Sequence, residues 1–256
     1  RRQRSKPFCR QIAAEANALA GNAAAAREHL AQLIVVGADV PYYRILPNLE
    51  LFWSEWAAGD KAAAGKSLDA ALADAPKIPK LGRNQLEISG RLAAALAAAG
   101  RIPDGLAILQ GHQSSEGDGQ LAAQVQISSD GGFGALSHDH AVLPWTSPQS
   151  VAATVALVSR NQLTAARDWA MAQPNDDAKA ECLAVWAQQR ALMSPQLGWS
   201  SGESEVGDAV KNLAPALASR VWARTALGRV GANDPQNAET ALKRASELLA
   251  SVAVPA

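Results

Sequence analysis

The chain has 256 residues, of which 48% are hydrophobic and 19% are charged, a composition typical of globular proteins and not of disordered ones. Its 24 Lys and Arg residues balance its 24 Asp and Glu residues. It therefore lacks the positive field that gathers nucleic acid, and we expect no nucleic-acid partner. No apolar run approaches the roughly 20 residues of a membrane helix, so we expect no stable membrane insertion. We expect a soluble domain of a bacterial-type protein, and Cys9 and Cys182 fit a cytoplasmic or an extracytoplasmic location.

The first part of the chain repeats one pattern, in which an alanine-rich helix ends at a turn and a second helix returns beside it. The turns are Gly21-Asn22, Gly59-Asp60 and Gly100-Arg101. This pattern predicts helix pairs over residues 8–37, 46–76 and 84–110. Pro47 is predicted near the start of a helix, where its missing N–H has no cost. Asn22 and Asp60 are predicted to cap the second helices of their pairs.

Helical periodicity stops in residues 111–148, which are rich in Gly, Ser and Asp. Within them, residues 124–128 alternate polar and apolar side chains and are predicted as a short strand. A long connection without structure of its own is usually functional or disordered. We predict an irregular insertion here, between helical parts at residues 1–110 and 149–256.

Two looser copies of the turn follow the insertion, at Arg160 and at Asn233, and Asp234 is predicted to cap the helix after the second copy. The 73 residues between these two turns are close to twice the length of a helical repeat. A further pair is therefore predicted between them. Its helices are expected over residues 177–192 and 205–213, joined by a loop over residues 194–202.

The five turns share a small residue five positions later and a large apolar residue four positions beyond that. A small side chain lets antiparallel helices approach closely, and the large one fills the groove against the partner helix. The small residues are Ala26, Ala64, Gly105, Ala165 and Ala238, and the large ones are Leu30, Leu68, Leu109, Trp169 and Leu242. The tryptophans in helical patterns are predicted to lie in the core, namely Trp53, Trp56, Trp169, Trp186 and Trp222.

These helix pairs resemble tetratricopeptide repeats and related α-solenoids over about two thirds of the chain. The closest match is Gly59–Leu72, with the sequence Gly-Asp-Lys-Ala-Ala-Ala-Gly-Lys-Ser-Leu-Asp-Ala-Ala-Leu. The Trp and Tyr residues usual in the first helices of such repeats are mostly missing. The resemblance implies an all-α fold of antiparallel helix pairs stacked in a right-handed superhelix. It also implies a protein or peptide partner, and neither catalysis nor a cofactor.

Five residues are candidates for binding a partner. Some tetratricopeptide domains clamp a peptide carboxylate with Lys, Asn and Arg side chains on the first helices. Here only Arg83, Asn84 and Arg91 are candidates for that role. Trp145 and Trp199 fall in predicted loops, where a tryptophan either caps the core or anchors a partner.

The only pattern that suggests metal chemistry is Ser137-His138-Asp139-His140. On a strand, His138 and His140 would share a face and could bind a divalent metal. The other interpretation is a polar loop whose imidazoles meet only water, since no third ligand stands at a recognisable spacing. No serine lies in a nucleophile elbow, and we expect no enzyme.

We therefore predict a protein- or peptide-binding helical-repeat scaffold, part of a larger polypeptide or assembly. A metal-dependent enzyme or sensor, with its site in residues 111–148, is the alternative.

Overall fold

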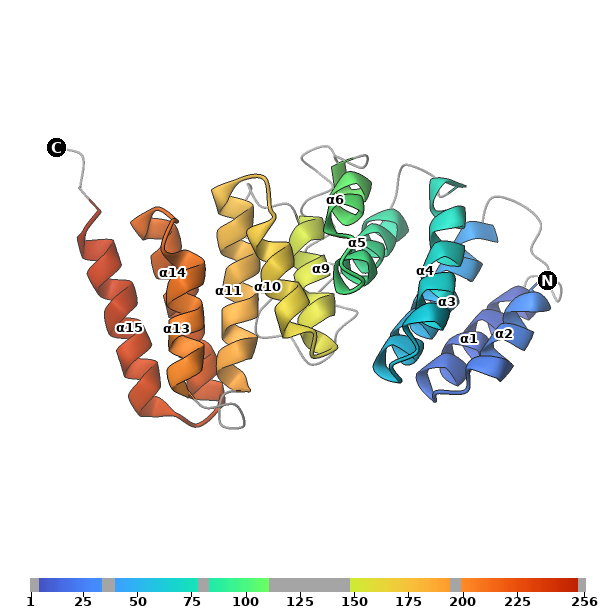
Figure 1. Ribbon diagram of the computed structural model, residues 1–256, viewed down its shortest axis with the longest axis horizontal. Coiled ribbons are helices and arrows are strands. Elements are labelled where there is room, and N and C mark those ends of the chain that lie inside the picture. Colours follow the sequence, from blue (N-terminus) through green and yellow to red (C-terminus); the bar gives the residue numbers. More distant parts are fainter. Residues whose placement is uncertain (1–4, 34–39, 78–82, 111–147, 194–198, 253–256) are drawn as a thin grey trace. The chain divides into compact units, whose positions relative to one another are not determined.

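The computed structural model describes residues 5–33, 40–77, 83–110, 148–193 and 199–252 (Figure 1). In these ranges the chain forms twelve α-helices and one short 3-10 helix, without a β-strand. The predicted all-α class is confirmed, whereas the right-handed superhelix stays a prediction. Among the described helices, none combines the length and the apolar character that crossing a bilayer requires. The chain divides into two compact units, residues 1–113 and 114–256.

The first unit contains three helix pairs. They are α1 (Ser5–Leu19) with α2 (Ala23–Ala31), α3 (Val40–Ala57) with α4 (Lys61–Asp74), and α5 (Arg83–Ala98) with α6 (Ile102–Gln110); the 3-10 helix Ala75–Lys77 follows α4. Helix α3 is central, because it packs against α1, α2, α4 and α5. It buries Ile45, Leu49 and Phe52 almost completely, so the core of this unit is built around it.

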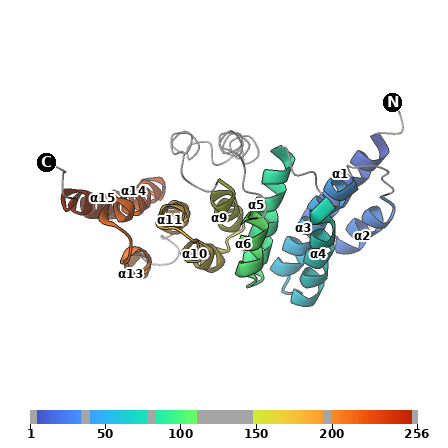
Figure 2. The ribbon, with the colours of Figure 1, turned by 90° about the horizontal axis from the view of Figure 1, so that it is seen from above.

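The second unit also contains three pairs. They are α9 (Pro148–Ser159) with α10 (Leu163–Met171), α11 (Asp176–Leu192) with α13 (Trp199–Val210), and α14 (Pro215–Gly231) with α15 (Pro235–Ala250). Here α11 is central and contacts α9, α10, α13 and α14. Figure 2 shows α10 and α13 on the same side of α9, α11 and α14.

Both units have the same order of helix contacts. The first helix of one pair packs against the first helix of the next, as in α1–α3, α3–α5, α9–α11 and α11–α14. The second helix also packs against the first helix of the next pair, as in α2–α3, α4–α5, α10–α11 and α13–α14. One apolar cluster shows the result: Ala14 and Ala18 of α1, Ala26 and Leu30 of α2, and Leu51 of α3 are buried together. The first pair thus buries part of its apolar surface against the second.

Five pairs turn through a residue with a left-handed backbone. Its φ is 77° at Gly21, 84° at Gly59, 76° at Gly100, 57° at Asn161 and 58° at Asn233. Asparagine tolerates this conformation better than most residues that carry a Cβ. The fourth turn residue is therefore Asn161, one position after the predicted Arg160.

The predicted helix caps are confirmed. The side chains of Asn22, Asp60 and Asp234 accept hydrogen bonds from the backbone N–H groups of Ala25, Ala63 and Asn237. A further cap, which the sequence analysis did not predict, is Asn175, which accepts a bond from the N–H of Ala178 at 2.8 Å. These bonds satisfy N–H groups that have no partner inside their own helices.

The shifted turn corrects the predicted packing of α10. Counted from Asn161, the small residue is Ala166 and not Ala165, and Ala166 is fully buried. Ala170 replaces Trp169 at the next position. Trp169 is still completely buried, and its indole N–H donates to the backbone oxygen of Ser150 in α9 at 3.0 Å. With this correction, the small residue after the turn is buried in all five pairs.

Leu242 contradicts the predicted pattern of large buried residues, because 54% of it is exposed. The corresponding Leu30, Leu68 and Leu109 are buried. Leu30 achieves this by packing with Leu51 of the following pair. Leu109, on the last described helix of the first unit, is buried, whereas Leu242, on the last described helix of the second, is exposed.

Two helices begin earlier than predicted. Helix α3 starts at Val40 and continues through Pro47, because its packing against four other helices outweighs the backbone hydrogen bond that proline removes. Helix α13 starts at Trp199, inside the predicted loop, whereas α11 matches its prediction to within one residue. Gly202 is buried inside α13, and a Cβ built on it would be in ordinary contact with the guanidinium group of Arg190, so this glycine does not end a helix.

The predicted core tryptophans are largely confirmed. Trp53, Trp169, Trp186 and Trp222 are buried. Trp56 is partly exposed; one face stacks on Phe52, with ring centroids 5.4 Å apart, and Lys61 Nζ lies 3.2 Å from its ring centroid. These aromatic residues of α3 therefore extend from the core, at Phe52 and Trp53, to the surface, at Trp56.

Candidate functional site

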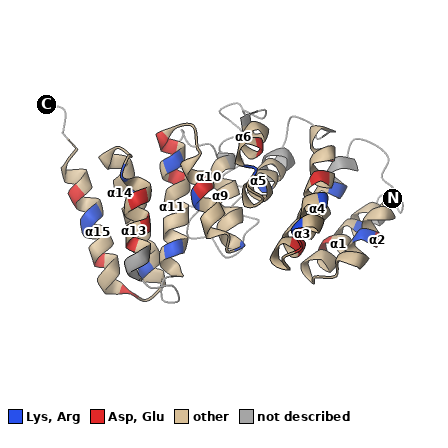
Figure 3. Ribbon diagram, viewed as in Figure 1, with Lys and Arg blue, Asp and Glu red and all other residues tan. Residues whose placement is uncertain are grey.

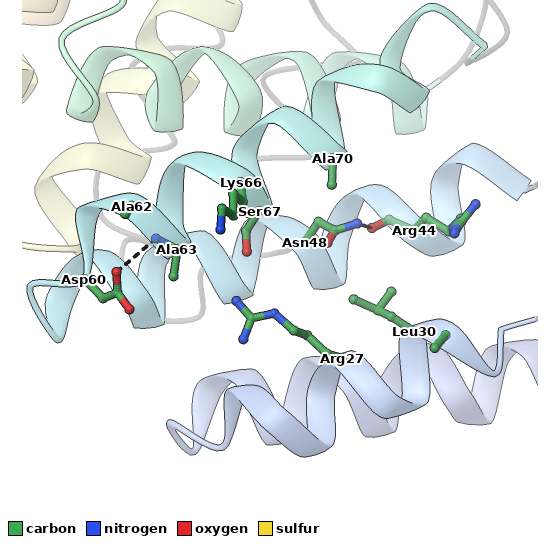
Figure 4. Close-up of a pocket in the computed structure, with 11 residues that line it drawn as sticks. Arg27, Leu30, Arg44, Asn48, Asp60, Ala62, Ala63, Lys66, Ser67 and Ala70 are labelled. Carbon is green, nitrogen blue, oxygen red and sulfur yellow. Dashed lines mark hydrogen bonds between the residues drawn. The ribbon is translucent and has the colours of Figure 1, made fainter.

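A groove of about 680 Å³ lies in the first unit, between α2, α3 and α4 (Figure 4). It forms because the second helices of two successive pairs, α2 and α4, both pack on α3. Its apolar lining consists of one leucine and four alanines, namely Leu30, Ala31, Ala62, Ala63 and Ala70. Its polar lining consists of Arg27, Arg44, Asn48, Asp60, Lys66 and Ser67. The groove therefore combines small walls with several charged groups.

A buried carboxylate connects the three helices beside this groove. The Glu55 side chain on α3 is only 6% exposed. One of its oxygens accepts a hydrogen bond from Nη2 of Arg27 on α2, and the other accepts one from Oγ of Ser67 on α4 at 2.8 Å. Because Glu55 is paired on both sides, its charge is compensated. The network fixes how α2 and α4 sit on α3.

Two other cations of the groove, Arg44 and Lys66, take no part in the Glu55 network. Arg44 and Lys66 are exposed, and neither has an ion-pair partner among the described residues. The only acid in the described lining, Asp60, accepts a hydrogen bond from the N–H of Ala63 at 2.9 Å as the cap of α4. Elsewhere, both signs of charge are intermingled on the helices of each unit (Figure 3). The groove thus has an excess of positive charge in a chain that is neutral as a whole.

Histidine and cysteine side chains, which often carry out catalysis or bind metals, lie outside the described part of this groove. In the described part of the chain, no three His, Cys, Asp or Glu side chains are grouped to hold a metal. Burial raises the pKa of the Cys182 thiol to about 12, so this thiol stays protonated at neutral pH and is a poor nucleophile. Cys9 is exposed and, like Cys182, a free thiol.

A second groove, of about 460 Å³, occupies the equivalent position in the other unit, between α13, α14 and α15. Its charged lining residues are Lys211, Arg244 and Glu247. Arg244 is already paired with Glu203 at 3.1 Å, and its Cζ lies 5.4 Å from the ring centroid of Trp222. Lys211 lies 3.9 Å from Asp208. In this groove, unlike the first, both cations have partners.

No protein-family model, curated protein or solved structure matches this chain. The function is therefore argued from the helix contacts and from the two grooves.

Of the five residues predicted to bind a partner, only Arg91 has a described side chain, and it lines neither groove. Arg91 lies on α5, where its Nη1 is 3.6 Å from Oε1 of the buried Glu50 on α3. This contact gives Arg91 a structural role between two helix pairs. Arg83 and Asn84 belong to the first turn of α5 and Trp199 is the first residue of α13, but their side chains fall outside the described ones. Trp145 lies outside the described residues.

The predicted metal ligands, His138 and His140, also lie outside the described residues, as does the predicted strand at residues 124–128. The metal site therefore stays a prediction.

The sequence analysis missed Arg27, Arg44 and Lys66. The repeat was defined by the neighbouring small and apolar positions, Ala26, Ala64 and Leu30, and these carry no information on the charged residues beside them. One feature of the sequence pointed to two of these residues. Arg27 and Lys66 each lie next to a residue that packs between helices, so their side chains begin at the edge of a helix contact. Whether such a side chain lines a groove depends on the helix that packs opposite to it, which the repeat pattern alone does not specify.

Proposed function

We propose that this chain is a helical-repeat scaffold that binds a protein or peptide, as part of a larger polypeptide or assembly. The observation that carries the proposal is the shared order of helix contacts in the two units. Stacking of this kind resembles that of tetratricopeptide repeats, in which each pair contacts only its neighbours along the chain. Such stacks serve chiefly to present extended binding surfaces.

Polar contacts between helices support the same proposal, because they help to hold the helices beside each groove in place. In the first unit, Glu55 connects α2, α3 and α4. In the second unit, Arg220 of α14 lies 3.2 Å from the buried Glu181 of α11, and Arg190 of α11 donates to Glu205 of α13 at 3.0 Å. A preformed groove loses little conformational freedom when a ligand binds, so more of the interaction energy appears as affinity.

The test is a selection of random-sequence peptides displayed on phage against the immobilised, full 256-residue chain. Recovered peptides would be synthesised with a fluorophore, and their binding measured by fluorescence anisotropy against scrambled versions of the same composition. We expect saturable binding with dissociation constants of about 1–100 µM, the range of a small, transient interface. If no recovered peptide binds better than its scrambled version, the proposed function is wrong.

A further inference from the structure

We propose that the groove between α2, α3 and α4 binds an extended peptide segment rich in acidic side chains, whose carboxylates are recognised by Arg44 and Lys66. This inference rests on the proposed function and specifies the chemistry of its partner and the site where that partner binds.

The charges in the groove favour an acidic ligand. Among the groove's cations, Arg27 is held by Glu55, and Asp60 is the only acid in the described lining. Arg44 on α3 and Lys66 on α4 have no acidic partner in the described part of the chain. A carboxylate that binds there would form charge-assisted hydrogen bonds, which are stronger than neutral ones. Complementary charge also speeds association and disfavours basic partners.

The shape of the groove favours an extended peptide. Along α4 the wall includes Ala62, Ala63 and Ala70, which are short enough for another main chain to approach closely. On the α3 side, Nδ2 of Asn48 donates to the backbone oxygen of Arg44 at 2.8 Å. The Asn48 amide keeps its Oδ1 and its second N–H to bond with the main chain of a peptide. Alternate side chains of an extended peptide would then meet the cations.

The lining also argues against nucleic acid as the occupant. Single-stranded nucleic acid is usually bound by aromatic side chains that stack on its bases, together with a groove of positive charge. The described lining of this groove contains no aromatic residue. The chain has no net charge, so it lacks the wider field that such binding uses.

Comparison of the two grooves selects the first one. They have equivalent positions in their units, yet the cations of the second are paired with Glu203 and Asp208, and Glu247 lies in its lining. An acidic peptide would have to displace these carboxylates. In the first groove, no carboxylate of the described chain has to leave Arg44 or Lys66 before a peptide binds.

The test compares the peptides selected by the wild-type chain with those selected by the double variant Arg44→Glu, Lys66→Glu. We expect the wild-type pool to be enriched in Asp and Glu, and the variant pool to lose this enrichment or to favour Lys and Arg. For a wild-type-selected acidic peptide, the variant should weaken binding at least tenfold, and added salt should reduce wild-type affinity. Lys243→Glu is the matched control, since Lys243 is an exposed cation on α15 outside both grooves; it should bind as the wild type does.

Arg44→Gln, Lys66→Gln is a second variant that removes charge without adding carboxylates, and circular dichroism should show the wild-type helix content for both. The inference is overturned if the wild-type pool is not acidic, or if well-folded groove variants bind acidic peptides as tightly as the wild type. Either result leaves the proposed function standing when other peptides bind. If no peptide binds at all, both proposals are wrong.

Discussion

Gly59 and Gly65 lie within seven residues of each other, yet the backbone conformation of each is different. Gly59 is in the turn between α3 and α4 with φ of 84°, and Gly65 lies inside α4. A Cβ added at either position would meet no other atom within 4 Å. Substitution by alanine therefore tests backbone conformation alone at both sites.

We expect Gly59→Ala to lower the free energy of unfolding by about 1–2 kcal/mol, because a left-handed backbone is strained once a Cβ is present. Gly65→Ala is the matched control and should raise it by about 0.5–1 kcal/mol, because alanine is the better helix former. Urea unfolding followed by circular dichroism measures both. Equal effects of the two substitutions would show that the turn does not require the left-handed conformation.

Glu181 is a residue whose charge has a cost in the folded state. Burial raises its pKa above the ordinary value for glutamate, and this effect outweighs the opposing attraction of Arg220 and Arg224. A carboxyl group whose pKa is raised on folding stabilises the protein below its unfolded pKa of about 4.3, and this contribution is lost as the pH rises through the folded value. At neutral pH the ionised Glu181 therefore lowers stability.

We expect Glu181→Gln to be more stable than the wild type at neutral pH and nearly equal to it below pH of about 4, since the wild-type carboxyl group is then protonated. Loss of the ion pair should cost little, because Arg220 is 45% exposed and can turn to water. Urea unfolding across this pH range gives the difference. Arg220→Gln is the companion variant and should be destabilising, more so at neutral pH. A Glu181→Gln variant less stable than the wild type at neutral pH would show that the ion pair outweighs burial.

At the scale of elements, the contact between α11 and α14 depends on a glycine. A Cβ added to Gly228 of α14 would collide with the backbone oxygen of Gln188 and approach Cβ of Ala191 to 2.8 Å. Neither atom belongs to the end of a flexible side chain. At Gly231, three residues later, the added Cβ would meet only Cδ1 of Leu192 at 3.0 Å, and Leu192 is 41% exposed. The two positions therefore differ in how easily their neighbours can move.

We expect Gly228→Ala to lower the free energy of unfolding by about 1–3 kcal/mol or more, because the two helices must separate to admit a methyl group. Gly231→Ala should change it by less than about 0.5 kcal/mol, since Leu192 can rotate away. Thermal unfolding of both variants and of the wild type measures these changes in stability. A well-tolerated Gly228→Ala would mean that α14 lies further from α11 than described.

Helix boundaries show where sequence reasoning worked and where it failed. Those of α11 were predicted to within one residue, because its apolar residues have helical spacing. Helix α3 was predicted to start near Pro47 and α13 after Gly202, since proline and glycine interrupt helices when only local preferences act. In the structure, packing against neighbouring helices carries both elements through these residues.

For the whole molecule, the repeat pattern predicted five or six helix pairs, and the described residues form six in two units. The pattern could be extended across the insertion because the turn residue and the small residue after it serve the same local need in each pair. It was less reliable for the large apolar position, as Leu242 shows. Burial at that position depends on how the helix packs in its folded unit, so it is not a property of the local sequence.

The sequence by itself determined the all-α class, most helix pairs, their caps and most of the core, because these follow from residues close together in the chain. Only the tertiary structure decided which charged side chains lie together in a groove. Arg27, Arg44 and Lys66 come from three helices, and their convergence depends on how α2 and α4 pack on α3. That packing also decided the roles of Glu55 and Arg91, each of which is paired with a residue on another helix.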